Sequence, residues 1–207
     1  MVLKAQPVGE SDRRVTILTS DRGKLGAFAR GARKNGSRFS AGTCTFAFGK
    51  FRLYAGRDSY TLSDLEITNY FEELRTDVEA AAYGAYFAEI ADYYGRENDD
   101  DRDLLALLYQ SLRALSSDVF DNTFVRSVYE LKAIAINGEY PGAPQDRPLL
   151  DGTRQALEFI GTCPPDRIYS FSLSEKALAE LREIAEVYCR RYMDHTFKSL
   201  EILSALC

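Results

Sequence analysis

The spacing of apolar residues changes once along this 207-residue chain, near Thr76, and this change constrains the fold more than any other feature. Before it, apolar and polar residues alternate at strand spacing, as in Val15–Thr19, Lys24–Arg30 and Tyr60–Thr68. After it, apolar residues recur at helical spacing. We therefore predict an α+β protein, with a β domain over residues 1–72 and an all-helical domain, a helical bundle, over residues 73–207.

Five short strands within about 70 residues, with no long helix between them, favour a small closed barrel of the OB-fold type. In Lys24–Arg30 the pattern places Leu25, Ala27 and Ala29 on one face. Gly49 is expected to form a bulge, after which Lys50, Arg52 and Tyr54 face away from Phe51 and Leu53. Residues 31–44 are basic and rich in Gly and Ser, which predicts a mobile loop, and Gly56-Arg57-Asp58 predicts a turn before the last strand.

Residues typical of helix starts and helix ends recur along the second domain. Thr76–Glu79 has the pattern of a capping box, and the helix behind it is expected to turn one stripe inward: Val78, Ala82, Ala85/Tyr86, Ile90 and Tyr93. Further helices are predicted from about Asp101, from Asp121 to the Asn137-Gly138 stop, and over residues 151–160. Ser174 is expected to cap one long last helix that reaches Leu203, and prolines keep the short loop over residues 138–149 non-helical.

Charge is divided as sharply as the apolar pattern. The first 57 residues hold 12 Lys/Arg against three acidic residues, a net +9, and the remaining 150 hold 14 against 28, a net −14. A basic segment on an acidic protein can bind a polyanion while the rest of the protein repels it. The alternative, a merely solvated surface, accounts less well for so large and local an excess.

The basic residues are the candidates for phosphate contacts, since these require Lys and Arg spread along a groove. Strand faces and the loop supply the predicted nucleic-acid-binding set: Lys24, Arg30, Arg33, Lys34, Arg38, Lys50, Arg52 and Arg57. Aromatic rings that could stack on bases are Phe28, Phe39, Tyr54 and Tyr60. Phe28 and Tyr54 share faces with cations and are compatible with either stacking or core packing, whereas Phe46, Phe48 and Phe51 are expected in the barrel core.

Catalytic motifs are poorly represented, and we predict neither an enzyme nor a cofactor. The single histidine, His195, falls on the apolar stripe of the predicted last helix, which indicates a packed structural residue. Gly42…Gly49-Lys50-Phe51 has the wrong spacing for a phosphate loop and Phe51 in place of Ser or Thr. In Asp99–Asp103, an acidic run, Leu104 and Gln110 replace the glycine and glutamate of a calcium loop.

The cysteines and the apolar runs bear on metal binding and location. Cys44, Cys163, Cys189 and Cys207 are scattered without close pairs, so we expect free thiols and no metal site. The chain holds no apolar run of about 20 residues and no signal-peptide pattern at its start, which predicts a cytoplasmic protein with no membrane contact.

Several runs of residues resemble the RecO recombination-mediator family of bacterial DNA repair. They are Gly9–Arg13, Thr19–Lys24, Ala29–Lys34, Ser37–Phe39, Leu53–Tyr54, Gly56–Arg57, Leu62–Glu66 and, more weakly, Lys198–Leu203. The resemblance implies an N-terminal OB fold, a helical domain and a role without turnover: binding of single- and double-stranded DNA, and annealing of complementary strands in the cytoplasm at the nucleoid. The implied partners are RecR, the RecA pathway and the C-terminal tail of single-strand binding protein. Arg30, Arg33, Lys34 and Arg38 match basic DNA-contacting positions of the family.

The chain departs from the family at one place. Many members hold a four-cysteine zinc module after a helix that ends in a Gly-Tyr-type turn, whereas here Asn137–Pro141 is followed within about ten residues by the next predicted helix. The resemblance therefore implies a variant without the module. Two other classes of function remain open: an RNA- or ribosome-associated OB-fold protein, and an interaction scaffold whose basic surface docks an acidic peptide.

Overall fold

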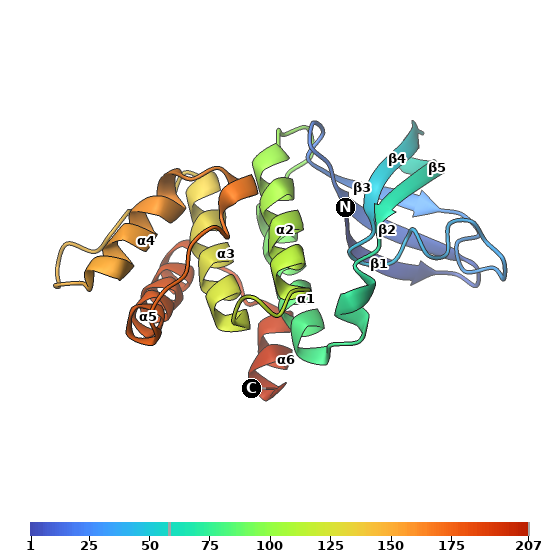
Figure 1. The fold of residues 1–207 in the computed structure, drawn as a ribbon. Helices are drawn as coiled ribbons and strands as arrows, with labels where there is room; N and C mark the ends of the chain where they lie inside the picture. Colours follow the sequence, from blue (N-terminus) through green and yellow to red (C-terminus); the bar gives the residue numbers. More distant parts are fainter. Residues whose placement is uncertain (58, 207) are drawn as a thin grey trace.

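The computed structural model describes residues 1–57 and 59–206, with side chains up to residue 203. Figure 1 shows a β-sheet at one end of the molecule and the helices extending from it, with α1 and α2 next to the sheet. Asp58 of the predicted turn and Cys207 lie outside the described residues.

The sheet contains five strands, β1 (Val2–Val8), β2 (Asp12–Leu18), β3 (Lys24–Ala29), β4 (Phe48–Ala55) and β5 (Tyr60–Asn69). Their spatial order is β1-β2-β3-β5-β4, antiparallel except for a short parallel contact between β3 and β5. The edge strand β1 contacts the segment just before β4, where the amide of Val2 donates to the carbonyl of Ala47 and the amide of Phe46 donates to the carbonyl of Val2, both at 2.9 Å. The five strands and the α+β class are confirmed, but the predicted closed barrel is wrong: among the described residues β1 and β4 form no strand pairing, so the sheet stays open between its two edge strands.

The strand faces follow the predicted alternation. Leu25, Ala27 and Ala29 are buried, and Lys50, Arg52 and Tyr54 are exposed. The register of β4 against β5 shifts between Phe48 and Gly49, which confirms the bulge. A Cβ at Gly49 would lie 2.1 Å from the carbonyl oxygen of Glu66, so only glycine permits this approach.

The helical part consists of α1 (Val78–Tyr94), α2 (Arg102–Leu115), α3 (Asn122–Ile136), α4 (Asp151–Thr162), α5 (Glu175–Tyr192) and α6 (Lys198–Leu206), with short 3₁₀ turns at Glu72–Arg75 and Pro165–Arg167. The predicted positions of α2, α3 and α4 are confirmed within two residues, and Ser174 caps α5 as expected. Gly138 has φ +77°, the left-handed conformation of a helix stop.

The expected stripe of α1 is wrong in part. Val78 is 69% exposed and Ala85 is also exposed, while Tyr83, Phe87 and six further residues are buried. A single stripe fails because α1 packs against α2, α3, α6 and the sheet, so most of its circumference is covered. Its cap is Asp77, whose carboxylate accepts from the amide of Ala80 at 3.0 Å, rather than Thr76.

The long last helix is also wrong, because α5 ends at Tyr192 and α6 begins at Lys198. The break lets Phe197 pack its buried ring edge-on against Tyr86 of α1, with centroids 5.6 Å apart. His195 therefore lies in a connecting segment, exposed, and stacks on Tyr93 at 5.3 Å instead of packing on a helical stripe.

The core runs from the helices into the end of the sheet. Met1, Leu3 and Leu18 belong to the same buried cluster as α1 and α2. Phe46 and Phe48, expected in the barrel core, pack against this helical cluster, and only Phe51 packs inside the barrel. The sheet domain is therefore held against α1 and α2 by apolar contacts at one end, which leaves its far end to solvent (Figure 1).

The loop over residues 138–149 is tied to the helices by two tyrosines. The Tyr140 hydroxyl donates to the carbonyl of Leu157 at 2.9 Å, and the Tyr188 hydroxyl donates to the carbonyl of Gly142 at 2.8 Å. Among the described residues, no helix combines the length and the apolar character that crossing a membrane would require.

Candidate nucleic-acid interface

The outer face of the sheet places side chains from all five strands in one cross-strand row. The register pairs Gln6 with Arg14, Arg14 with Phe28, Phe28 with Thr61 and Thr61 with Tyr54. Adjacent strands lie about 4.8 Å apart, so the row spans the width of the sheet. Two rings and a guanidinium thus share one face, the combination that a single strand of nucleic acid requires.

Arg14 is a candidate that the sequence analysis missed. It is exposed, and its guanidinium lies over Gly26 of β3, where a Cβ would approach its nitrogens to 3.8 and 4.0 Å. The alternation that buries Val15 and Ile17 could have identified it, since Arg14 stands on the opposite face from both.

The loop over residues 31–44 is anchored to the sheet at both ends. The Asp12 carboxylate accepts from the amide of Gly31 at 2.7 Å, and the carbonyl of Ser11 accepts from the amide of Arg33 at 2.8 Å. The Arg33 guanidinium also donates to the carbonyl of Gly9 at 3.1 Å. Residues 31–44 are predicted as a mobile loop, and these bonds hold its first residues and the Arg33 side chain on the sheet domain.

Arg13 fastens the other half of the same loop. Its Nη1 donates to the carbonyl of Ser40 at 2.6 Å and to Oγ1 of Thr43 at 3.0 Å. Thr43 is fully buried and donates in turn to the carbonyl of Phe39 at 2.7 Å. Arg13 is therefore a structural residue, whereas its neighbour Arg14 points outward.

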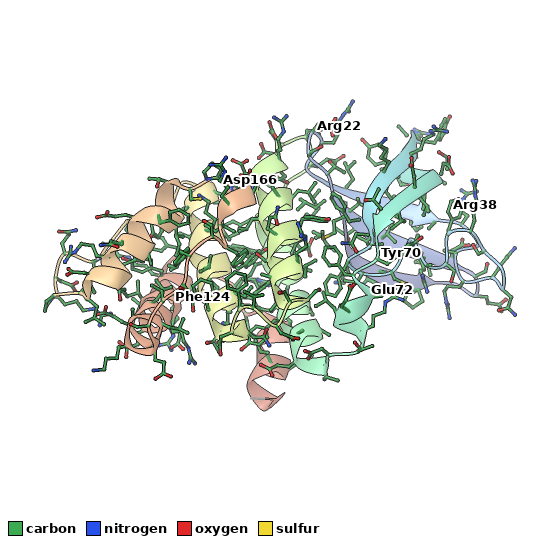
Figure 2. The ribbon with its side chains drawn as sticks, viewed as in Figure 1. Arg22, Arg38, Tyr70, Glu72, Phe124 and Asp166 are labelled. Atoms are coloured by element: carbon green, nitrogen blue, oxygen red, sulfur yellow. The ribbon has the colours of Figure 1, made fainter. Side chains whose placement is uncertain are left out.

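The tip of the loop reaches back to the last two strands. Arg38 donates through Nη2 to the carbonyl of Ser63 at 2.6 Å and forms an ion pair of 3.3 Å with Asp64. The same carboxylate lies 3.6 Å from Nη1 of Arg52 on β4. Figure 2 shows Arg38 at the end of the sheet domain that is farthest from the helices.

Lys24 does not belong with the other predicted cations. Its Nζ forms an ion pair of 3.0 Å with the carboxylate of Asp92 on α1 and also donates to the carbonyl of that residue. Strand alternation gives the face of a side chain but does not show that a helix covers one end of that face, so this pairing could not be predicted.

The remaining predicted cations are solvent-exposed, namely Arg30, Lys34, Lys50 and Arg57. Lys50 lines a groove of about 720 Å³ between β4, the β2–β3 turn and α2, together with Arg22. Figure 2 places Arg22 at the side of the sheet domain that meets the helices, opposite Arg38. Cations therefore lie at both ends of the sheet domain, the end that meets the helices and the end that is farthest from them.

The candidate stacking rings differ in availability. Tyr54 is 70% exposed, and Phe28 is half-buried on the same face, with Thr61 of β5 between them. Phe39 is half-buried with the Arg38 guanidinium over its ring, 4.7 Å from the centroid, so that cation covers one face. Tyr60 packs against the barrel cluster and lines the groove beside Lys50.

The cysteines do not fit the zinc module of the resemblance. Cys44 lies in the sheet domain, Cys163 follows α4 and Cys189 is on α5, and burial raises the pKa of the last two thiols. Over residues 1–57 and 59–206, no three His, Cys, Asp or Glu side chains gather as metal ligands would.

A five-stranded OB sheet with a cationic loop and outward aromatic rings, joined to a helical domain, defines a class of nucleic-acid-binding proteins. Family comparison places the chain within that class. The model described as "Recombination protein O N terminal" matches residues 1–71, and "Recombination protein O C terminal" matches residues 75–145. Together they match more than half of the chain, which belongs to the RecO family.

Individual relatives show the same similarity, two of them over the whole of this chain. The chain is 26% identical to the DNA repair protein RecO of Acetivibrio thermocellus, over 238 positions that cover 100% of this chain and 95% of the relative. It is 26% identical to that of Bacillus subtilis, covering 100% and 92%, and 33% identical to that of Clostridium novyi over 67% of this chain and 54% of the relative. The 238 aligned positions exceed the 207 residues of this chain, so that relative has segments absent here.

Proposed function

We propose that this protein binds single- and double-stranded DNA through the sheet domain and anneals complementary strands during repair. The proposal rests chiefly on one observation: the fold brings Arg38 of the basic loop to Arg52 of β4 through the shared carboxylate of Asp64, while Arg33 of the same loop is held at Gly9 between β1 and β2. Annealing needs no acid or base catalyst, since cations offset the repulsion between two phosphate backbones and base pairing supplies specificity.

Affinity across a salt series tests the ligand class. Binding of a DNA oligonucleotide, an RNA of the same sequence and an acidic peptide would be measured in parallel with the full chain. We expect DNA binding whose log K falls steeply with log salt, because each phosphate contact releases counterions. Tighter RNA binding would favour the ribosome- or RNA-associated alternative, and preference for the peptide would favour the docking scaffold.

Arg33→Ala plus Arg38→Ala tests the loop. The double variant should lower the salt slope by about one to two, because each arginine that no longer neutralises a phosphate reduces the number of counterions released. Arg113→Ala plus Arg154→Ala removes the same charge from exposed positions of α2 and α4 and is the matched control. An unchanged slope in the loop variant, or an equal change in the control, would refute the loop assignment.

The family relationship supports a wider role as a mediator in the bacterial cytoplasm. In this role the protein acts together with RecR and assists the loading of RecA onto DNA that is coated by single-strand binding protein. The helical domain is then the proposed docking site for the acidic tail of that protein. A coated-strand annealing assay, with and without RecR and with the tail deleted, would test both partners. Equal annealing with the intact and the tail-deleted single-strand binding protein would refute the proposed docking of the tail.

We also propose that this variant lacks the zinc module. The division into domains of residues 1–72 and 73–207 is likewise a proposal. Elemental analysis of the purified protein tests the absence of the module. Stoichiometric zinc would contradict the assignment of Cys44, Cys163 and Cys189 as thiols.

A further inference from the structure

Among the residues that the structure describes, Asp64 is the one acidic side chain that forms ion pairs with two of the proposed DNA-binding arginines. It lies on β5, directly opposite Arg52 of β4 in the register of the sheet. Its Oδ1 is 3.3 Å from Nη1 of Arg38, and its Oδ2 is 3.6 Å from Nη1 of Arg52. One carboxylate therefore uses one oxygen for each guanidinium, although the two arginines are 14 positions apart in the sequence.

The two guanidiniums remain open to a further ligand. The side chains of Arg38 and Arg52 are 67% and 79% exposed, so a ligand can reach both from solvent. Arg38 is held from behind by the carbonyl of Ser63 and by the ring of Phe39. Its position is therefore fixed by contacts that a ligand at the Asp64 side would leave intact.

We propose that Arg38 and Arg52 form one binding site for a backbone phosphate, and that Asp64 occupies this site in the free protein. The carboxylate and a phosphate both offer oxygens at the spacing that paired guanidiniums bind. Ion pairs between exposed side chains are weak and readily exchanged, so a phosphate can displace the carboxylate. Asp64 thus positions the two arginines and competes with DNA for them. This inference rests on the proposed DNA binding.

Glu66 provides the matched comparison. It is exposed on the same strand, two residues beyond Asp64, and faces Lys50 in the register. Among the described residues it forms no ion pair with either arginine. Glu66→Gln therefore removes the same charge from the same surface without opening the proposed site.

The experiment measures equilibrium binding of a single-stranded DNA oligonucleotide to the full chain with Asp64→Asn or Glu66→Gln. Each is made in the wild-type background and in Arg38→Ala plus Arg52→Ala. Both single variants gain affinity from the lost negative charge, but Asp64→Asn should gain about three- to tenfold more than Glu66→Gln. This extra gain should vanish when both arginines are absent. Equal gains, or an extra gain that survives without the arginines, would overturn the proposal.

A second measurement separates this inference from the proposed function. Nε–Hε resonances of Arg38 and Arg52 would be followed by NMR during titration with inorganic phosphate. Both should shift together, at lower phosphate concentration in Asp64→Asn, and Asp64→Ser serves if the amide variant misfolds. Wild-type protein that fails to bind DNA but shows these shifts would refute the proposed function alone. No joint shift in folded protein would refute the phosphate site.

Discussion

Two arginine–carboxylate networks, one in each part of the molecule, differ chiefly in their exposure. In the sheet domain, Asp64 bridges two arginines whose side chains are mostly in solvent. In the helical domain, Glu130 is 1% exposed and accepts from Nε of Arg126 and from the Tyr86 hydroxyl, both at 2.8 Å. Burial raises the pKa of Tyr86, and Glu130 raises it further.

The comparison indicates what each network can do. A buried carboxylate depends on its donors, and removing any member of the network leaves an uncompensated polar group in the interior. The exposed pair can exchange partners at little cost. The same residue types therefore stabilise the fold in one place and remain free to meet a ligand in the other. Four substitutions test this contrast, ordered by the expected loss of folding free energy.

Glu130→Ala should give the largest loss, about 3 kcal/mol, because Arg126 and Tyr86 would both lose the partner that compensates their burial. Chemical denaturation measures it. DNA affinity of the folded fraction should not change, since the proposed DNA-binding residues lie on the sheet and its loop, away from Glu130 of α3. A loss below about 1 kcal/mol would show that the buried network resembles the exposed one.

Asp121→Ala should cost about 1 kcal/mol at neutral pH, because the carboxylate caps α3 through the amides of Thr123 at 2.8 Å and Phe124 at 3.3 Å. Hydrogen bonding to Thr123 lowers the pKa of Asp121 in the folded state. The stabilisation is therefore present above the unfolded pKa of about 3.9 and is lost as pH falls through the lower folded value. Unfolding curves of both proteins should converge in acid, and a constant difference would contradict the cap.

Lys24→Met tests a cation that lies in the basic segment but pairs internally. Its loss should cost roughly 0.5–1 kcal/mol, because the ion pair and the bond to Asp92 are only partly buried. The salt slope of DNA binding should stay the same. A slope that falls as it does on loss of Arg33 would return Lys24 to the DNA-binding set.

Tyr54→Ala should change folding least, by less than about 0.5 kcal/mol, since the side chain is 70% exposed. Affinity for single-stranded DNA should fall by about 1–3 kcal/mol if one base stacks on the ring. Duplex affinity should be nearly unchanged, because its bases are already stacked. Equal losses on both forms of DNA would argue against stacking.

Much of the fold could be predicted because local periodicity and capping residues specify it. Alternation correctly assigned the buried face of β3 and the exposed face of β4, and the caps located α3 and α5. The break after Tyr192 could not be predicted. No Gly or Pro marks it, and it arises where the Glu89 carboxylate accepts from the amides of Lys198 and Ser199 at 3.2 and 2.9 Å.

The candidate site likewise has features that the sequence predicts and features that it does not. The amino-acid sequence predicts which segment is cationic, which face of each strand is polar and where the basic loop lies, because charge and side-chain period are properties of neighbouring residues. Which cations are available depends on the folded arrangement, in which Lys24 pairs with α1, Arg13 bonds to the loop and Asp64 joins Arg38 to Arg52. Those outcomes depend on contacts between residues that are distant along the chain, and no local pattern encodes them.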